Sequence, residues 1–315
     1  MAERPRVLVT PRSAPGHPSL AWLSEAGYDV VIPAPGRVPS VREQRDAMAT
    51  AVGYVAGIEP IGADLLRSAP RLRVISRNGV GADAIDIGAA AELGIDVLRA
   101  PAANAQGVAE LAVALILASA RSVPAAAQAI REGRWERTQG VELAGRTLGI
   151  IGCGQIGRRV ARMAVAIGME VIGFDAYPDA AFELPGFRYA SQAEVLRSAD
   201  VLSLHAPPGE RPLIDRSVIA QLRPRAILVN TARAALVDDR AVLEALDDGR
   251  LARYAADVFD PEPPGDTPLT RHPLFIGTPH IGGYTSESVD RAMEAAVRQL
   301  IERLDSARGR EFDGH

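Results

Sequence analysis

The sequence predicts an α/β protein with two doubly wound, parallel-sheet (Rossmann-like) domains, and three observations support this prediction. The chain has 315 residues, about twice the usual length of a single domain. Short apolar runs alternate with amphipathic segments, as in βαβ units whose helices cover both faces of a parallel sheet. A glycine-rich turn, GCGQIG, directly follows one of the apolar runs. We therefore expect two sheets, with this turn in the second.

The first series of apolar runs lies in the N-terminal hundred residues. It comprises RVLVT (6–10), YDVVIP (28–33), VGYVAG (52–57) and RVISR (73–77), with helix-like stretches such as 63–69 between them. After this series comes VAELAVALILASA (108–120). This segment is too short and too rich in small residues for a membrane span. We expect it to form a buried helix at a subunit interface.

The second series of apolar runs predicts the second sheet. It comprises RTLGIIG (146–152), EVIGFD (170–175), DVLSLHA (200–206), AILVNTA (226–232) and YAADVF (254–259). The final helix, 286–304, follows this sheet and has no strand partner of its own, so we expect it to fold back on the first domain. The predicted domains are residues 102–283 and a discontinuous, flavodoxin-like unit of residues 1–101 and 284–315, with hinges near Pro101 and Gly283.

Composition and charge exclude several classes of function. Charged residues make up 23% of the chain, the net charge is −4, and no basic stripe indicates a nucleic-acid partner. The N-terminus lacks a signal-peptide pattern and no run is long enough to span a membrane, which favours a cytoplasmic protein without a membrane partner. The single cysteine allows no internal disulfide and no cysteine-built metal site, and we expect no metal. The chain has no lysine, which excludes a lysine Schiff base and a Walker-type phosphate loop.

The glycine turn has the spacing of a dinucleotide-binding loop. Gly152 permits a tight turn after the strand, Gly154 lets a pyrophosphate approach the backbone, and Gly157 lets helix and strand pack closely. The helix from Gln155 directs its N-terminal amides at the phosphates. Asp175 ends the next strand, about 20 residues on, where a carboxylate meets the adenosine ribose.

The residues after Asp175 distinguish between the two nicotinamide dinucleotides. The Asp175 carboxylate repels a 2′-phosphate, and Ala176 and Tyr177 supply no arginine to compensate. The sequence therefore predicts NAD as the cofactor in preference to NADP.

Five further segments, together with the glycine turn, resemble the D-isomer-specific 2-hydroxyacid dehydrogenase family, in its short phosphoglycerate dehydrogenase-like form without a regulatory domain. They are SRNGVGADAIDI (76–87), NAQGVAELAVALILA (104–118), NTARAALVDDRAVLEAL (230–246), DVFDPEPP (257–264) and TPHIGGYTSES (278–288). The resemblance covers nearly the whole chain. It implies an NAD-dependent oxidoreductase that transfers a hydride between nicotinamide and a small D-2-hydroxy or 2-oxo acid, and that forms homodimers through the helix at 108–120.

The resemblance assigns three residues to the family's catalytic set, and their chemistry agrees with that assignment. Arg233 presents a planar guanidinium that binds carboxylate and carbonyl oxygens together. His280 can both donate and accept a proton near neutral pH. Glu262 orients the imidazole and stabilises its charged form.

The resemblance also implies supporting residues around the substrate and the cofactor. The substrate is expected to contact Arg77, Asn78, Gly79, Val80, Asn104, Arg233 and His280. The cofactor is expected to contact Gly152, Gly154, Gln155, Ile156, Gly157, Asp175, His205, Ala206, Pro207, Thr231, Ala232, Arg233, Asp257, His280 and Gly282. Among these, Gly79 offers backbone amides to the substrate carboxylate and Asp257 meets the nicotinamide carboxamide.

Departures from the family pattern narrow the range of expected substrates but do not identify a single one. Ala234 replaces a usual glycine, and we expect an ordinary backbone there. Ala56, Gly57 and Ile58 supply neither the arginine nor the hydroxyl expected near a substrate phosphate. 3-Phosphohydroxypyruvate is therefore less favoured than hydroxypyruvate or glyoxylate, while a phosphonate such as phosphonopyruvate also fits.

Three alternatives share this fold. Formate dehydrogenases lack the glutamate partner that Glu262 supplies, and phosphite dehydrogenase needs a lysine. A dinucleotide-sensing, corepressor-like interaction protein is the alternative from another functional class, and it would bind NADH without turnover of 2-oxo acids.

Overall fold

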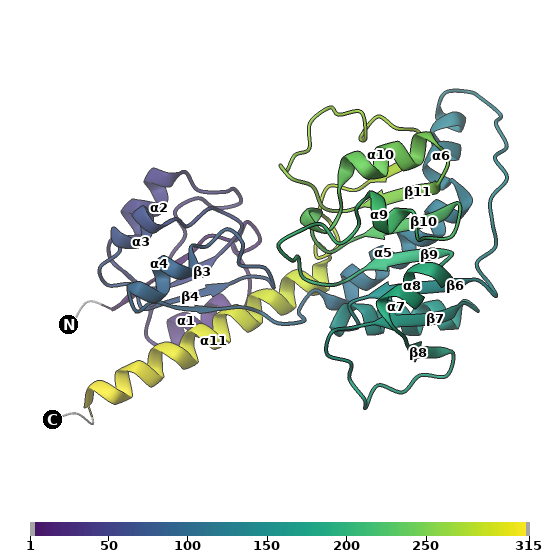
Figure 1. Ribbon diagram of the computed structural model, residues 1–315. Coiled ribbons are helices and arrows are strands. Elements are labelled where there is room, and N and C mark those ends of the chain that lie inside the picture. The colour runs from purple at the N-terminus through teal and green to yellow at the C-terminus, as the bar shows by residue number, and fades with distance from the viewer. Residues whose placement is uncertain (1–3, 313–315) are drawn as a thin grey trace. The chain divides into compact units, whose positions relative to one another are not determined.

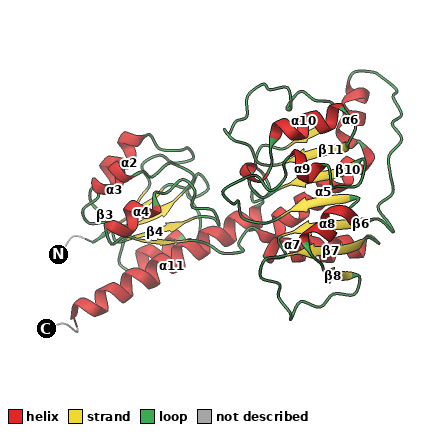
Figure 2. Cartoon of the chain, viewed as in Figure 1, coloured by secondary structure: helices red, strands yellow, loops and turns green. Residues whose placement is uncertain are grey.

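The computed structural model describes residues 4–312, and side chains as far as residue 306. The ends of the predicted discontinuous domain, residues 1–3 and 313–315, lie outside this range. The chain divides into two compact units (Figure 1): unit 1 is Met1–Asn104 with Thr285–His315, and unit 2 is Ala105–Tyr284. The sequence analysis placed the two boundaries between these units after Pro101 and Gly283, and the structure has them after Asn104 and Tyr284. Both units combine helices with a wholly parallel sheet (Figure 2).

Unit 1 contains a five-stranded sheet in the order β2-β1-β3-β4-β5, the flavodoxin-like order. Its strands are β1 (Arg6–Val9), β2 (Asp29–Val31), β3 (Ala51–Ala56), β4 (Val74–Arg77) and β5 (Asp96–Leu98). Its helices are α1 (Leu20–Glu25), α2 (Val41–Met48), α3 (Ala63–Arg67), α4 (Ile87–Glu92) and α11 (Ser286–Phe312). Side chains of α2, α3 and α4 pack in one core, and those of α1 and α11 pack in another.

The last helix packs closely on the sheet of unit 1, as the sequence predicted. Met293, Val297 and Leu300 of α11 are fully buried in the core that contains β1, β3 and β4. A Cβ atom on Gly53 of β3 would lie 2.9 Å from a methyl carbon of Leu304. Glycine at position 53 therefore lets the helix approach the strand.

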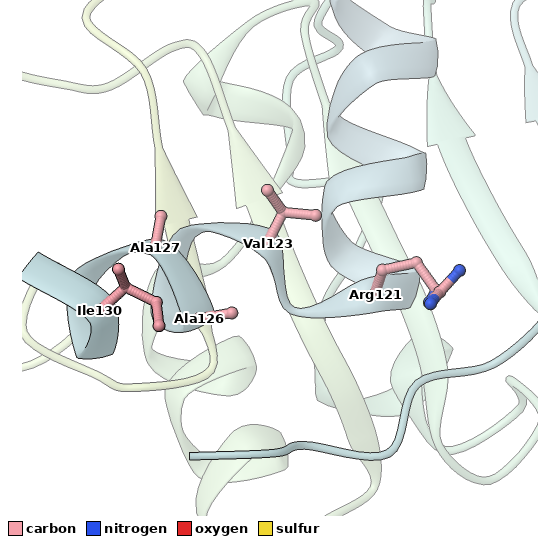
Figure 3. Close-up of a pocket in the computed structure, with 5 residues that line it drawn as sticks. All are labelled: Arg121, Val123, Ala126, Ala127 and Ile130. Atoms are coloured by element: carbon pink, nitrogen blue, oxygen red, sulfur yellow. The ribbon is translucent and has the colours of Figure 1, made fainter. Parts of the chain in front are cut away.

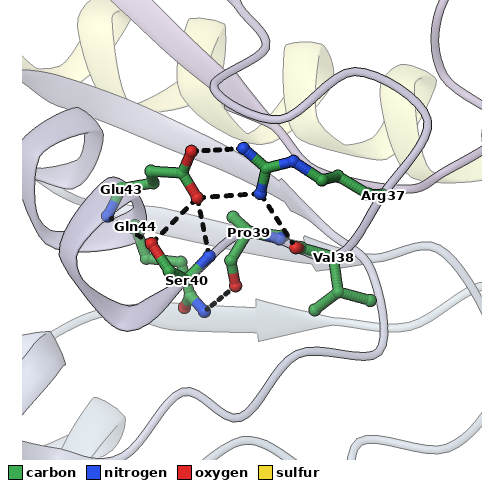
Figure 4. A network of polar contacts seen from close by, with 6 residues as sticks. All are labelled: Arg37, Val38, Pro39, Ser40, Glu43 and Gln44. Carbon is green, nitrogen blue, oxygen red and sulfur yellow. Dashed lines mark hydrogen bonds and ion pairs between the residues drawn. The ribbon is translucent and has the colours of Figure 1, made fainter.

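Helix α2 begins at a capping box, which its sequence encodes. The Ser40 side chain accepts a hydrogen bond from the Glu43 amide, and the Glu43 carboxylate accepts one from the Ser40 amide at 2.8 Å. Arg37 donates to the same carboxylate, with one pair of atoms at 2.9 Å (Figure 4). These contacts satisfy amide groups that the first turn of a helix leaves unpaired.

Unit 2 contains a seven-stranded sheet in the order β12-β11-β10-β9-β6-β7-β8. Its strands are β6 (Thr147–Ile151), β7 (Glu170–Phe174), β8 (Phe187–Tyr189), β9 (Val201–Leu204), β10 (Ala226–Asn230), β11 (Leu251–Ala256) and β12 (Phe275–Gly277). Its helices are α5 (Ala105–Arg121), α6 (Val123–Arg131), α7 (Gln155–Ala166), α8 (Gln192–Ser198), α9 (Arg216–Ile219), the 3₁₀ helix η1 (Ala234–Leu236) and α10 (Asp239–Asp247). The strand order reverses between β6 and β9, which is the ligand-binding crevice of a Rossmann fold.

Helix α5 covers the segment that the sequence analysis predicted as a buried helix. Ala109, Ala112 and Ile116 are almost fully buried in the core that α5 shares with α7. Within residues 4–312, no single helix is long and apolar enough to span a membrane. Helices α5 and α6 taken together have the length and composition of a membrane span, but the chain bends by 66° between them.

Candidate active site

The glycine turn lies where the strand order of unit 2 reverses. Gly152 follows β6 with a φ angle of 93°, and a Cβ atom on it would lie 2.5 Å from the Ala206 amide nitrogen after β9. A Cβ atom on Gly157 would lie 2.1 Å from the Gly152 carbonyl oxygen. No larger residue fits at either position without moving the backbone, so these glycines hold strand, turn and helix together at the crevice.

The N-terminus of α7 opens onto free space beside a fixed carboxylate. Gly154 caps this 12-residue helix, and among the described residues no side chain bonds the cap and no atom lies within 4 Å of a Cβ placed there. The two oxygens of Asp175 accept hydrogen bonds from the amides of Cys153 (2.7 Å) and Tyr177 (2.8 Å). Free helix amides suit a pyrophosphate, and a carboxylate held over the turn suits ribose hydroxyls.

Two buried polar atoms at the neighbouring strand ends also fit a polar ligand. His205 Nδ1, after β9, and Thr231 Oγ1, after β10, have no hydrogen-bond partner within the described part of the chain. The other ring nitrogen of His205 lies 2.9 Å from Ser203 Oγ. Burial lowers the pKa of His205 to about 4, which keeps the ring neutral at neutral pH. Buried polar atoms normally have partners, so the residues present fit the predicted dinucleotide.

A carboxylate–imidazole pair lies in the loops that follow β11 and β12. His280 Nδ1 is 2.8 Å and 2.9 Å from the two Glu262 oxygens. Glu262 also accepts a hydrogen bond from the Phe259 amide at 3.0 Å. Both side chains are partly exposed, at 52% for His280 and 40% for Glu262. The pair is therefore oriented through Nδ1 and remains accessible to a small ligand.

Asp257 holds the loop that carries His280, a role that the sequence analysis missed. One of its oxygens accepts from Thr278 Oγ1 (2.6 Å) and the Ile281 amide (2.8 Å), and the other accepts from the Gly282 amide (2.8 Å). The residue is only 2% exposed. The sequence analysis expected Asp257 to meet the nicotinamide carboxamide. That cofactor contact stays a prediction, and the hydrogen bonds described above make Asp257 a positioning residue for the His280 loop.

A second positioning residue, Asn230, fixes the turn that carries Arg233. Its side-chain amide donates to the Arg233 carbonyl oxygen (2.9 Å), and its side-chain oxygen accepts from the Ala232 amide (3.0 Å). Arg233 has an extended backbone, and η1 begins at Ala234 without a positive φ angle. The expectation of an ordinary backbone at Ala234 is confirmed.

The remaining predicted substrate residues belong to unit 1. Arg77 ends β4, Asn78 bonds through its amide to the Ala56 carbonyl oxygen (2.9 Å), and Gly79 turns with a φ angle of 148°. The Gly79 amide donates to the Arg77 carbonyl oxygen at 2.8 Å. The expected contact of this turn with the substrate carboxylate stays a prediction. Asn104 is the last residue of unit 1 before α5.

Comparison with known proteins identifies the family. Residues 113–282 match the family described as D-isomer specific 2-hydroxyacid dehydrogenase, NAD binding domain. The chain belongs to this family. The matched range includes the glycine turn, Asp175, Arg233, Glu262 and His280, and it identifies this part of unit 2 as an NAD-binding domain.

Individual members of the dehydrogenase family show how far the similarity extends. The chain is 43% identical to a D-3-phosphoglycerate dehydrogenase of Methanocaldococcus jannaschii over 75% of its own length, but spans only 46% of that relative. It is 39% identical to a hydroxypyruvate reductase of Thermotoga maritima, over 78% of this chain and 81% of the relative. A crystal structure of D-lactate dehydrogenase from Aquifex aeolicus with NAD and lactic acid has 28% identity and a TM-score of 0.80, covering 95% of this chain and 96% of the other.

Gly154, the N-cap of α7, and Gly157, in the first turn of that helix, provide a paired test of the NAD-binding turn. Gly157→Ala would force a Cβ atom against the Gly152 carbonyl oxygen. We expect this variant to lose about 2–3 kcal/mol of folding stability and also to lose NADH binding. Gly154→Ala meets no atom of the described chain, so it should fold like the parent but bind NADH more weakly. Thermal unfolding and NADH fluorescence titration measure both effects. Unchanged NADH affinity in Gly154→Ala would show that the phosphates bind elsewhere.

Proposed function

We propose that this chain catalyses the NAD-dependent interconversion of a small D-2-hydroxy acid and the corresponding 2-oxo acid. The observation that carries the proposal is the His280–Glu262 pair, within 2.8 Å, in the same unit as the NAD-binding glycine turn. Proton transfer to a carbonyl oxygen beside a bound nicotinamide requires an oriented proton carrier of this kind.

The protein residues supply binding, orientation and proton transfer. When bound, reduced nicotinamide supplies the hydride that adds to C2 of the oxo acid. The guanidinium of Arg233 holds the substrate carboxylate and polarises the carbonyl oxygen. His280, held at Nδ1 by Glu262, gives the proton on Nε2 to that oxygen, and it takes the proton back in the oxidation direction. Glu262 compensates the imidazolium charge, and Asp257 keeps the His280 loop in place.

The substrate is a small 2-oxo acid of the hydroxypyruvate, glyoxylate, phosphonopyruvate or 3-phosphohydroxypyruvate type. The names of the two relatives, a D-3-phosphoglycerate dehydrogenase and a hydroxypyruvate reductase, support this range. Oxidation of NADH should be followed with each of these acids and with phenylpyruvate as a larger comparison. We expect turnover with at least one small acid. Tight NADH binding without turnover of any acid would contradict the proposal and favour a dinucleotide-sensing role.

We propose that the protein forms a homodimer in which α6 takes part. Val123 and Ile130 of α6 are 52% and 58% exposed, and Leu117 near the end of α5 is 42% exposed. A pocket beside them is lined by Arg121, Val123, Ala126, Ala127 and Ile130 (Figure 3). Clustered exposed apolar side chains are typical of a protein interface. Most of α5 is already buried inside unit 2, so α6 offers the larger share of free apolar surface.

Light scattering tests this interface directly. Val123→Asp combined with Ile130→Asp should convert a dimer into monomers, because two carboxylates would be buried in an apolar contact. Val41→Asp, on exposed α2 of unit 1 (61% exposed), is the matched control and should leave the mass unchanged. A parent protein of monomer mass, or an unaltered dimer in the double variant, would contradict the interface.

A further inference from the structure

An ion pair in unit 2 joins helix α7 to the loop that follows β7. The guanidinium of Arg158, one turn into α7, donates a hydrogen bond to Oδ2 of Asp179. Arg158 Nε also lies 3.4 Å from the Gly154 carbonyl oxygen, so the side chain folds back toward the glycine turn. The two side chains are 24% and 42% exposed. The guanidinium is therefore partly shielded from water and held by a carboxylate.

The loop after β7 holds Asp179 in place for this contact. The other carboxylate oxygen of Asp179 accepts a hydrogen bond from the Ala181 amide at 3.0 Å. The Asp179 amide donates to the Tyr189 hydroxyl oxygen of β8 at 3.3 Å. Both carboxylate oxygens thus have donors, as suits an ionised aspartate. The pair is built into the loop, unlike a contact between two freely moving surface side chains.

This ion pair spans the same gap as Asp175, the carboxylate that is predicted to meet the adenosine ribose. Asp175 joins the glycine turn to the loop through the amides of Cys153 and Tyr177. Arg158 and Asp179 join them again, one residue further along the turn and two residues further along the loop. In Rossmann folds, an arginine near this carboxylate position accommodates the 2′-phosphate of NADP. Arg158 is placed for that role, but it is already paired.

The charges around this gap oppose a further anion. Arg158 brings one positive charge, whereas Asp175 and Asp179 bring two negative charges. Arg162, one turn further along α7, lies with its guanidinium carbon 5.0 Å from the centre of the Phe182 ring, which Arg158 also approaches at 5.6 Å. A phosphate that reached Arg158 would lie beside the carboxylate already bound there, and like charges at such short range repel.

We propose that Asp179 is a specificity-determining residue that withholds Arg158 from the 2′-phosphate of NADP. Two carboxylates then select NAD together: Asp175 repels the phosphate, and Asp179 occupies the cation that would otherwise bind it. The inference rests on the proposed function in one respect, because it concerns the cofactor that this function uses. Its test needs binding alone, so its outcome does not depend on turnover of any 2-oxo acid.

The test measures the dissociation constants of NADH and NADPH by fluorescence titration at constant ionic strength. The affinity for NADPH relative to NADH should rise at least about fivefold in Asp179→Asn, because the freed guanidinium can bind the phosphate. It should rise further when Asp175→Asn is added. The matched control is Glu194→Gln, which removes a carboxylate from another ion pair of unit 2, with Arg188 at 2.6 Å, and should change this relative affinity by less than about twofold. An unchanged relative affinity in Asp179→Asn, or an equal change in Glu194→Gln, would overturn the proposal.

Two arginines of α7 separate the release of Arg158 from a general loss of negative charge. Arg158→Gln added to Asp179→Asn should return the relative affinity to the parental value. Arg162→Gln added to Asp179→Asn removes the neighbouring cation at the Phe182 ring and should keep the gain. Loss of the gain in both double variants, or in neither, would contradict the proposal.

Thermal unfolding distinguishes cofactor selection from a purely structural ion pair. A lower melting temperature of Asp179→Asn with an unchanged relative affinity would mean that the pair only fastens the loop, and the proposal would be wrong. If Asp179→Asn does not fold, Asp179→Ser gives the same comparison, since it keeps a short acceptor for the Ala181 amide.

Discussion

His280→Ala is expected to lower kcat for reduction of the preferred 2-oxo acid by about 10²- to 10⁴-fold, the range typical of a lost general acid. The carbonyl oxygen would then take its proton from water instead of from an imidazole oriented by Glu262 at 2.8 Å. NADH binding should be retained, because the glycine turn and Asp175 are unaltered. Steady-state kinetics and a fluorescence titration with NADH measure the two properties separately.

His272→Ala is the matched control for this change. His272 belongs to the same unit and lies 3.4 Å from Asp247, away from the residues assigned to catalysis. We expect its kcat to stay within about twofold of the parent. Unimpaired turnover by His280→Ala at neutral pH would refute the assignment of the proton carrier.

Arg233→Ala is expected to raise KM and lower kcat together, with kcat/KM reduced roughly 10³-fold, as for two lost charge-assisted hydrogen bonds. In the proposed mechanism the guanidinium both binds the carboxylate and orients the carbonyl, so its loss would affect the ground state and the transition state. Arg240→Ala, on the surface of α10 (87% exposed), is the control and should behave like the parent. Parental kinetics in Arg233→Ala would show that another group holds the substrate.

Much of the fold follows from local sequence patterns. The helix after the glycine turn begins at Gln155 as predicted, because GxGxxG after an apolar strand encodes both the turn and the close packing of Gly157. Strands β5, β8 and β12 were not predicted. Each has only three residues, and their partial burial gives no extended apolar run.

The candidate site is less completely encoded in local patterns. The family resemblance pointed to His280 and Glu262, and the structure brings them together. The positioning roles of Asp257 and Asn230 were missed, because each depends on hydrogen bonds to backbone groups of loops that only the folded chain brings near. The cytoplasmic location stays a prediction.

The central claim is that this protein directs a hydride from NADH to one face of C2 of a 2-oxo acid and a proton to the carbonyl oxygen. The most direct test is to incubate the protein with the small 2-oxo acid that it reduces fastest and with NADH carrying two deuterium atoms at C4, and then to analyse the product by mass spectrometry and chiral chromatography. The account predicts the D-2-hydroxy acid with one deuterium at C2, which is D-glycerate if the substrate is hydroxypyruvate. An unlabelled product, or the L enantiomer, would contradict it.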